Sequence, residues 1–545
     1  MRPETGTSDR RAATTVAVTT AKRAARSAVV WGVVMGAWVL QQALTYRSSF
    51  PTAASRAQFA QAFGHNSAFA ALVGPARRLD TVGGYMAWRC LGVLIILGAI
   101  WGLLTATRLL RGEEDAGRWE LLLAGRTARH RAAVQAMAGL AAGWAVMWAV
   151  TAGCTLAAGS RPDVGFPVSA SLFYATAATA SAAVFLAIGA LASQLAPTRR
   201  QANGLAAAVF AVAFVIAMVA NSVSGLAWMR WASPLGWLEN LAPLTGSRPL
   251  AFVPVILLIA AAAAAAVALA GRRDLGAAVL ARRQPARAST GLLGGPAALV
   301  FWLERWVALS WVAGLAVLAL AFGVVARSAA AGNVVVPTIE QAVGRLGGHP
   351  VGAAAAWMGY EFLFIAALIA IAAVGQISGV RGEEADGHLD NLLARPVSRG
   401  SWLAGRLGFA VVLVLAAGLA SGAAGWIGVA TRHSAIGFGA MMQAGLSVAV
   451  PALFLLGLGT LLYGLLPRLA VPVLYAVVLW SFLVEITGSS LTSNHWLIDT
   501  ALLSHLGPVP ATGVDWTAVA WLTGLGVICA LAGLAAFRRR DLAAA

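Results

Sequence analysis

The chain is organised by long apolar segments that short polar or basic segments separate. A run of about 20 apolar residues forms a helix that crosses the ~30 Å hydrocarbon core of a bilayer. The runs lack the alternation of a membrane β-strand, so helices are expected. Twelve spans are predicted in two sets of six, at residues 28–46, 85–107, 132–158, 168–193, 203–226 and 251–270, and at 300–325, 354–379, 403–430, 438–465, 470–489 and 516–536.

The two sets of spans are related by an internal repeat. The RGEE sequence at residues 111–114 recurs at residues 381–384, an offset of 270, and Pro197 matches Pro467 at the same offset. Each sixth span ends in RRDL, at 272–275 and at 539–542. An even number of spans per copy gives both copies the same orientation, so parallel repeats about an axis along the membrane normal are expected.

The predicted fold class is therefore an all-α polytopic membrane protein with twelve transmembrane helices in two tandem six-helix repeats. The repeat predicts five parts: a cytoplasmic N-terminal segment (1–27), a first six-helix domain (28–270), a cytoplasmic linker (271–298), a second six-helix domain (299–537) and a cytoplasmic tail (538–545).

The charged residues set the expected orientation. The chain is 59% hydrophobic and only 11% charged, with a net charge of +18. Its arginines form short clusters beside the spans, which is typical of the positive-inside rule and not of a nucleic-acid surface. We therefore expect the inner (cytoplasmic) membrane, both termini and both RGEE sequences on the cytoplasmic side, and no nucleic-acid partner.

The sequence lacks the motifs of several kinds of enzyme and metal site. The only lysine, Lys22, lies outside any glycine-rich phosphate-binding loop, so the chain is not itself a P-loop ATPase. No catalytic residue and no metal site is predicted, and the three cysteines read as small buried hydrophobes. Glu361 and Glu485 are either polar residues at the outer interface or the ionisable groups that an ion-coupled carrier needs.

The RGEE sequences open two acidic segments that directly follow the second span of each half. As helices, they would align Glu113, Gly117 and Glu120 on one face, and Glu383, Gly387 and Asp390 on the other copy's face. Glu114 and Arg118 would form an i,i+4 pair. The segments are either interfacial helices with a solvated polar face, or docking sites whose carboxylates meet Arg or Lys of a symmetric partner. Identity at nine of their first twenty positions favours docking.

The pattern R-x-E-E-x-x-G-x-x-x-x-L-L resembles the segment after the second helix of ABC-2 type exporter permeases. The terminal FRRRDL and the sequence SPLGWLENLAPLTG (233–246) resemble that family's last helix end and its outer loop between helices 5 and 6. The fused twelve-span form is similar to actinobacterial tetronasin and polyketide antibiotic efflux permeases and to mycobacterial multidrug efflux permeases.

The resemblance implies a permease that exports hydrophobic drugs or antibiotics with energy from separate ABC ATPase subunits, two per chain. ATP and Mg would bind to those partners and no cofactor to this chain. The residues that would couple to the ATPase are Arg111, Glu113, Glu114, Gly117, Glu120, Arg381, Glu383, Glu384, Gly387 and Asp390. A path for a hydrophobic small-molecule substrate along spans 2, 5, 8 and 11 would include Trp88, Met218, Phe362, Phe364 and Phe482, although such side chains also serve in packing.

Two other functions fit a twelve-span chain. An ion-coupled antiporter would need no ATPase, and a membrane immunity or scaffold protein would transport nothing. The doubled acidic segment and the scarcity of charge within the spans favour the ATP-driven exporter.

Overall fold

The structure is a computed structural model. It describes residues 5–64, 70, 74–123, 128–222, 224–274, 278–280, 295–331, 353–385, 387–431, 436–487, 499–505 and 507–541. Within these ranges all regular secondary structure is helical. The chain divides into two compact units, Met1–Pro285 and Ala286–Ala545, and the division falls inside the predicted linker 271–298. Most of that linker lies outside the described residues.

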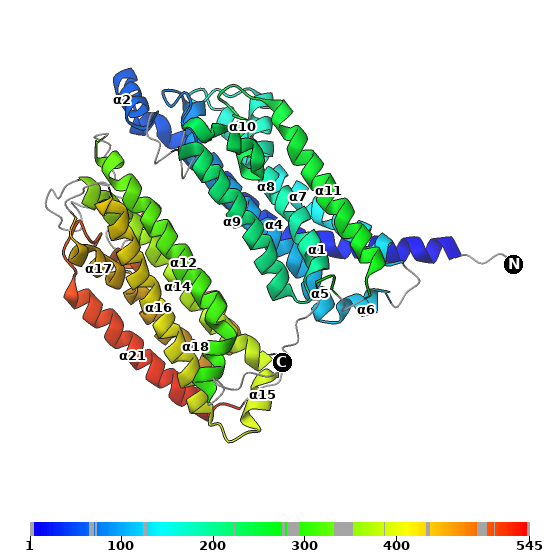
Figure 1. Ribbon diagram of the computed structural model, residues 1–545, viewed down its shortest axis with the longest axis vertical. Helices are drawn as coiled ribbons and strands as arrows, with labels where there is room; N and C mark the ends of the chain where they lie inside the picture. The colour runs from blue at the N-terminus through cyan, green and yellow to red at the C-terminus, as the bar shows by residue number, and fades with distance from the viewer. Residues whose placement is uncertain are drawn as a thin grey trace. The chain divides into compact units, whose positions relative to one another are not determined.

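Unit 1 begins with an unusually long helix and contains the first set of predicted spans (Figure 1). Its α-helices are α1 (Thr5–Ser49), α2 (Ala53–Gly64), α4 (Val82–Leu109), α5 (Arg111–Asp115), α6 (Arg118–Leu123), α7 (Arg129–Gly159), α8 (Val168–Leu195), α9 (Arg199–Ser222), α10 (Pro234–Asn240) and α11 (Phe252–Arg272). Two 3₁₀ segments, η1 (Ser224–Ala232) and η2 (Pro249–Ala251), flank α10.

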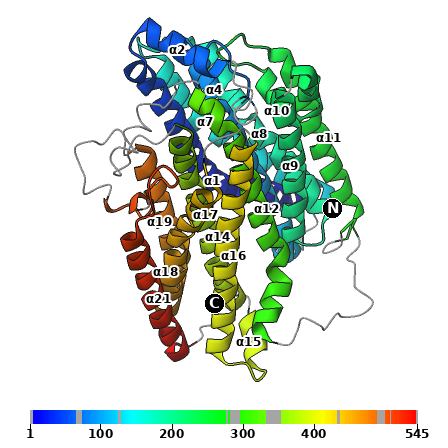
Figure 2. The same ribbon diagram turned by 60° about the vertical axis from the view of Figure 1, so that its left-hand side comes forward.

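Unit 2 contains the second set of predicted spans, and Figure 2 shows its helices from a second side. Its α-helices are α12 (Pro296–Ala331), α14 (Ala353–Ala385), α15 (His388–Leu393), α16 (Arg399–Ala430), α17 (Phe438–Ser447), α18 (Val450–Leu465), α19 (Pro467–Thr487) and α21 (Trp516–Arg539). One 3₁₀ turn, η4, spans Leu503–His505.

Within the described residues, eleven helices are long and apolar enough to cross a membrane. The chain is thus a multi-pass, all-α membrane protein, as the sequence predicts. The twelve-span count is not confirmed, because the continuously described part of α19, Pro467–Phe482, is shorter than the predicted span 470–489. Residues 488–498 lie outside the described residues, and so does the side chain of Glu485.

Two helix boundaries differ from the predicted spans. α1 begins at Thr5, within the predicted N-terminal segment 1–27, and continues through the first predicted span. The predicted span 438–465 is broken into α17 and α18. Pro451 explains the break, since a proline cannot donate an N–H bond and its ring clashes with the carbonyl of the fourth residue before it, here Ser447.

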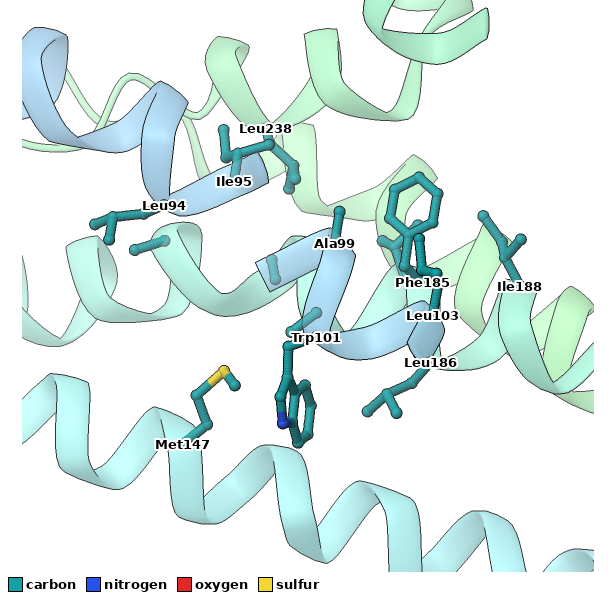
Figure 3. Packing of buried hydrophobic residues seen from close by; sticks show 14 of the residues in the cluster. Leu94, Ile95, Ala99, Trp101, Leu103, Met147, Phe185, Leu186, Ile188 and Leu238 are labelled. Atoms are coloured by element: carbon teal, nitrogen blue, oxygen red, sulfur yellow. The ribbon is translucent and has the colours of Figure 1, made fainter. Parts of the chain in front are cut away.

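The core of unit 1 forms where α4 passes between its neighbours. Leu94, Ala99 and Trp101 on α4 are almost fully buried. Figure 3 shows the Trp101 ring pointing from α4 toward α7, which carries Met147. A Cβ atom on Gly102 would collide with the backbone of α8 at Ala182. Small residues therefore let α4 and α8 approach closely, which is how membrane helices gain packing energy without a hydrophobic driving force.

Candidate functional site

The candidate site consists of the first RGEE segment, Arg111–Leu123, and the second RGEE segment, Arg381–Leu393. The first lies on α5 and α6, at the end of unit 1 opposite α10 (Figure 1). In the second, Arg381–Glu384 belong to the last turn of α14, and α15 follows. Each segment therefore continues the second spanning helix of its unit, so any displacement of the segment acts directly on that helix.

Both segments turn at a glycine, which corrects the prediction of one continuous helix. Gly117 and Gly387 adopt left-handed backbone conformations, with φ of +70° and +69°. Side chains other than glycine enter this region at a cost, because Cβ approaches the backbone carbonyl oxygen. The turn separates the RGEE residues from the LL residues. Glu113, Gly117 and Glu120 consequently do not form one helical face, and Arg118 pairs with Glu113 instead of Glu114.

Glu114 binds an arginine that is distant in the sequence, near the last residues of unit 1. Its two carboxylate oxygens accept hydrogen bonds of 2.7 Å and 2.5 Å from the two terminal nitrogens of Arg273. Both side chains are largely buried, at 8% and 11% exposure. The Nε of Arg273 donates to Gln194 Oε1 over 2.7 Å. We call this set of three residues clamp 1; it joins the end of α4 and α5 to the ends of α8 and α11.

The first RGEE segment also holds the start of α9. Arg111 is 2% exposed and donates to the carbonyl oxygen of Pro197 over 2.6 Å. Its Nε donates to Asp115 Oδ1 over 2.9 Å, and Asp115 Oδ2 accepts the backbone N–H of Arg199 over 2.8 Å. A carboxylate at a helix N-terminus satisfies a free N–H group and the positive end of the helix dipole. Asp115 thus caps α9 from a different helix.

Glu113 is held between two arginines. Arg23 on α1 approaches its Oε2 to 2.5 Å, and Arg118 donates to both of its oxygens over 2.5 Å and 2.9 Å. The Glu113 side chain is 12% exposed, whereas Arg23 and Arg118 are about half exposed. The carboxylate therefore faces the protein, and the charge presented to solvent at this point is positive.

The second RGEE segment contains an equivalent of clamp 1. Both oxygens of Glu384 accept hydrogen bonds from one terminal nitrogen of Arg540, over 2.6 Å and 2.7 Å. The hydroxyl of Tyr463 donates to Glu384 Oε2 over 2.5 Å. Arg540 also lies 5.0 Å above the Tyr463 ring, a cation–π distance. Glu384, Arg540 and Tyr463 form clamp 2, which joins the end of α14 to the ends of α18 and α21.

The two clamps use corresponding positions of the repeat. Arg273 and Arg540 are the C-cap residues of α11 and α21, the last spanning helix of each unit. Positive charge at a helix C-terminus is favourable because the last carbonyl groups carry the negative end of the dipole. Arg381 donates to the carbonyl oxygen of Arg468 at the start of α19 over 3.2 Å, much as Arg111 does at the start of α9.

The first glutamate of each motif has different partners in the two units. Glu383 lies 3.3 Å from Arg406 on α16, and Arg406 is also 4.0 Å from Glu304 on α12. Glu113, in contrast, binds Arg23 on α1. The two RGEE segments are thus equivalent at the clamp and different beside it.

These pairings differ from the assignment that the sequence suggested. Glu113, Glu114, Glu383 and Glu384 bind cationic groups of their own chain, where docking to cations of a partner was expected. Among the predicted coupling residues, Glu120 and Asp390 are exposed, and Gly117 and Gly387 are partly exposed. The surface open to a partner is therefore the turn and the short helix after it.

The partners that build the clamps cannot be identified from the sequence. Arg273 and Arg540 belong to the RRDL repeat, which marks the duplication but not their contacts. Gln194 and Tyr463 share no signal in the sequence. One is an amide and the other an aromatic residue, and they occupy adjacent rather than equivalent positions of the repeat.

The predicted substrate-path residues lie on their expected helices. Trp88 on α4 is 5% exposed and its ring contacts Phe63 and Phe59 on α2, at 5.1 Å and 5.9 Å. Met218 is partly buried on α9. In unit 2, Phe364 on α14 meets Phe482 on α19 edge-on at 5.5 Å.

Phe362, the fifth of these residues, is 1% exposed on α14. The structure thus brings Phe364 and Phe482 together, and a role of any of the five in transport stays a prediction. Glu361, which precedes Phe362, is 8% exposed and interacts with other groups.

A polar cluster lies beside Trp88, at the α10 end of unit 1. The Asn221 amide donates to Glu239 Oε2 over 2.8 Å, and Arg230 Nε donates to Asn221 Oδ1 over 2.6 Å. A cavity of about 30 Å³ is lined by Trp88, Arg77 and Glu239. Burial raises the pKa of Glu239 to about 7, although Asn221, Arg230 and Arg77 act to lower it.

In the part of the chain that the structure describes, no group of three or more His, Cys, Asp or Glu side chains is placed to hold a metal ion.

Comparisons with known proteins match both units to the same family model. The family model described as "Multidrug efflux system permease Rv1217c, C-terminal domain" matches residues 51–273 and 293–538, one segment in each unit and each with an RGEE segment. The chain is 31% identical to the multidrug efflux system permease protein Rv1217c of Mycobacterium tuberculosis over 503 residues, which cover 90% of this chain and 88% of that protein.

Proposed function

The chain belongs to the family of multidrug efflux system permeases, and from this premise we propose that it is the membrane subunit of an ATP-driven exporter. It would move hydrophobic drugs or antibiotics out of the cell across the inner membrane. The sequence has no P-loop, so ATP and Mg would bind to a separate ABC ATPase.

The main support for the proposal is the clamp that occurs at the helix ends of each unit. Glu114–Arg273 and Glu384–Arg540 fix two similar segments at the ends of two six-helix units. Two equivalent attachment points fit two copies of the ATPase per permease chain. We place both segments and both termini in the cytoplasm, in agreement with the basic clusters that surround them.

The clamps suggest how force from the ATPase would reach the spanning helices. The partner would contact the exposed parts of each segment, including Glu120 and Asp390. The buried carboxylates would not bind the partner; they would fasten the segment to the fourth, fifth and sixth helices of its unit. A segment held this way would move those helices with it, because breaking a buried, hydrogen-bonded ion pair costs much free energy.

The ion-coupled antiporter is the second candidate that the sequence left open. It would need a titratable group within a span that alternates between protonation states. Glu239 titrates near neutral pH, but it lies on α10, between the spans. We therefore favour the ATP-driven exporter.

The experiment combines two charge reversals on the exposed side, Glu120→Lys and Asp390→Lys. The exporter would be expressed with its ATPase, and both co-purification and efflux of a fluorescent hydrophobic drug would be measured. We expect an inserted and stable permease that retains less ATPase and exports more slowly. The control is Asp163→Lys, in the loop between α7 and α8.

The energy source is tested in the same cells. Efflux that persists after ATP depletion while a proton gradient remains would identify an antiporter. Full co-purification and full efflux in the double reversal would refute docking at the exposed side.

A further inference from the structure

An apolar groove runs between α7 and α11 on the outside of unit 1. It encloses about 670 Å³ and is lined by Val134 on α7 and by Ala264, Val267 and Ala268 on α11. Val134 is 46% exposed, and Ala264 and Ala268 are exposed as well. Residues four apart lie on one face of a helix, so these two alanines form a shallow floor along α11. The groove is thus an open apolar trough on a membrane-spanning surface.

One end of this groove is basic. His130 and Arg272 line it, and Arg272 continues the row of Ala264 and Ala268 on α11. Arg129, His130 and Arg131 are all exposed in the first turn of α7, where Arg129 donates to Asp274 Oδ1 over 2.9 Å. The N-cap residue, Ala128, offers no side-chain hydrogen bond to the first-turn N–H groups. A helix N-terminus of this kind favours an anion, because its N–H groups and the dipole both point toward it.

We propose that this groove binds an anionic phospholipid. The acyl chain would lie along α7 and α11, and the headgroup phosphate would bind His130, Arg272 and the N-terminus of α7. A neutral drug would leave the basic end without a counter-charge, and a soluble anion would leave the trough empty. An amphiphile with a terminal anion satisfies both halves of the groove.

In the orientation proposed above, the basic end of the groove lies on the cytoplasmic side of the membrane, where anionic headgroups are found. Basic pockets between membrane helices bind anionic headgroups on the cytoplasmic side. Arg272 immediately precedes Arg273 of clamp 1, so the site adjoins the first RGEE segment. The binding itself does not depend on what the chain transports.

Unit 2 supplies a matched control, because the corresponding place is built differently. The N-terminus of α16 is capped: Ser398 Oγ accepts the N–H of Ser401 over 3.1 Å. The guanidinium of Arg538 packs against Gly400 in the first turn of α16, within 2.5 Å to 2.9 Å of where a Cβ would lie. Arg539, which matches Arg272 in the RRDL repeat, is therefore expected to contribute nothing to the proposed site.

The test is native mass spectrometry of the purified full chain in detergent, titrated with phosphatidylglycerol or with phosphatidylcholine. We expect tighter binding of phosphatidylglycerol. Arg272→Gln should weaken it about fivefold, the effect of one basic residue on anionic lipid. Arg539→Gln should leave it unchanged. Ala268→Phe fills the trough without changing charge and should weaken both lipids.

Three results would overturn the proposal. These are equal binding of the two lipids to the unmodified chain, phosphatidylglycerol binding that Arg272→Gln and Arg539→Gln reduce alike, and binding that Ala268→Phe leaves intact. Thermal melting of each variant without lipid establishes that it is folded. Ala264→Phe replaces Ala268→Phe if the latter does not fold.

Discussion

Glu114 and Arg273 form a bidentate ion pair between the end of the second spanning helix of unit 1 and the end of its sixth, 159 residues apart in the chain. Glu384 and Arg540 repeat this relationship in unit 2 over 156 residues. A pair that survives twice in a duplicated chain, at the same two helix ends, is a mechanical feature of the unit. It explains why Glu114 and Glu384 occur at these helix ends: each neutralises a largely buried arginine.

The first prediction concerns the charge of clamp 1. Glu114→Arg should lower the free energy of unfolding by about 3–5 kcal/mol, because it leaves Arg273 buried beside a like charge. Combining it with Arg273→Glu restores one pair of opposite charges and should recover part of that loss; Arg111, which lies 3.6 Å from Glu114 Oε2, would still face a like charge. Gln194 tolerates the exchange, since its amide can donate as well as accept. Chemical denaturation in detergent measures the effect.

The control for this exchange is the pair of Arg129 and Asp274, which lie 2.9 Å apart but are 43% and 87% exposed. Arg129→Ala should cost less than about 1 kcal/mol, as exposed ion pairs do. If the exchanged double variant were no more stable than Glu114→Arg alone, the pair would not be the stabilising element.

The second prediction concerns the hydroxyl of clamp 2. Tyr463→Phe keeps the ring under Arg540 and removes only the hydrogen bond to Glu384. Hydrogen bonds to charged groups contribute about 1.5–3 kcal/mol, so unfolding should become easier by that amount. Tyr475→Phe is the control, because Tyr475 is 42% exposed and should change stability little. Equal effects of the two substitutions on the melting temperature would contradict this role of Tyr463.

The third prediction is a pH dependence that comes from Glu239. Its pKa is raised from the ordinary 4.5 to about 7 in the folded protein, chiefly by burial. A raised pKa means that folding favours the protonated form, so stability is fully present below pH 4.5 and falls as the pH rises to about 7. The loss is roughly 3 kcal/mol, from about 1.4 kcal/mol per pKa unit.

Melting temperatures between pH 5 and pH 8 measure this dependence, and Glu239→Gln should flatten the curve. Asn221, Arg230 and Arg77 face the carboxylate and act to lower its pKa. An unchanged curve for Glu239→Gln would assign the pH dependence to another group.

The fourth prediction concerns the turn in each RGEE segment. Gly117→Ala and Gly387→Ala should each cost about 1–2 kcal/mol, because both residues have φ near +70° and only the backbone conformation opposes the substitution. Gly117→Asn should cost less, since asparagine enters the left-handed region more readily. Gly64→Ala, at the end of α2 where φ is not positive, is the control. Destabilisation by Gly64→Ala as large as by Gly117→Ala would argue against strain at the turn.

Most of the fold could be predicted from the sequence. An apolar run of about 20 residues has one stable form in lipid, because every backbone polar group must be satisfied within the segment. The helices α4, α7 and α8 therefore fall where the hydrophobic pattern places them. The sequence was less informative where a span is interrupted, as at Pro451, since local geometry competes there with hydropathy.

The candidate site was only half visible in the sequence. The RGEE repeat located it, and the charge pattern placed it at the basic ends of the helices. Which carboxylate meets which cation could not be read, because Glu114 and Arg273 are far apart in the chain and every arginine near a helix end is an equal candidate. Helical spacing in the sequence favoured Arg118 as the partner of Glu114. Because the chain turns at Gly117, Arg118 pairs with Glu113 instead.

The sequence by itself determined that this protein crosses the membrane many times, that it is duplicated and that it has no P-loop, since these properties follow from local composition and from the motifs that the sequence contains. Only the tertiary structure decided that Glu114 and Glu384 face inward. A carboxylate beside buried arginines gains more from a bidentate pair of fixed geometry than from solvent, and that geometry exists only after α4, α8 and α11 have packed together.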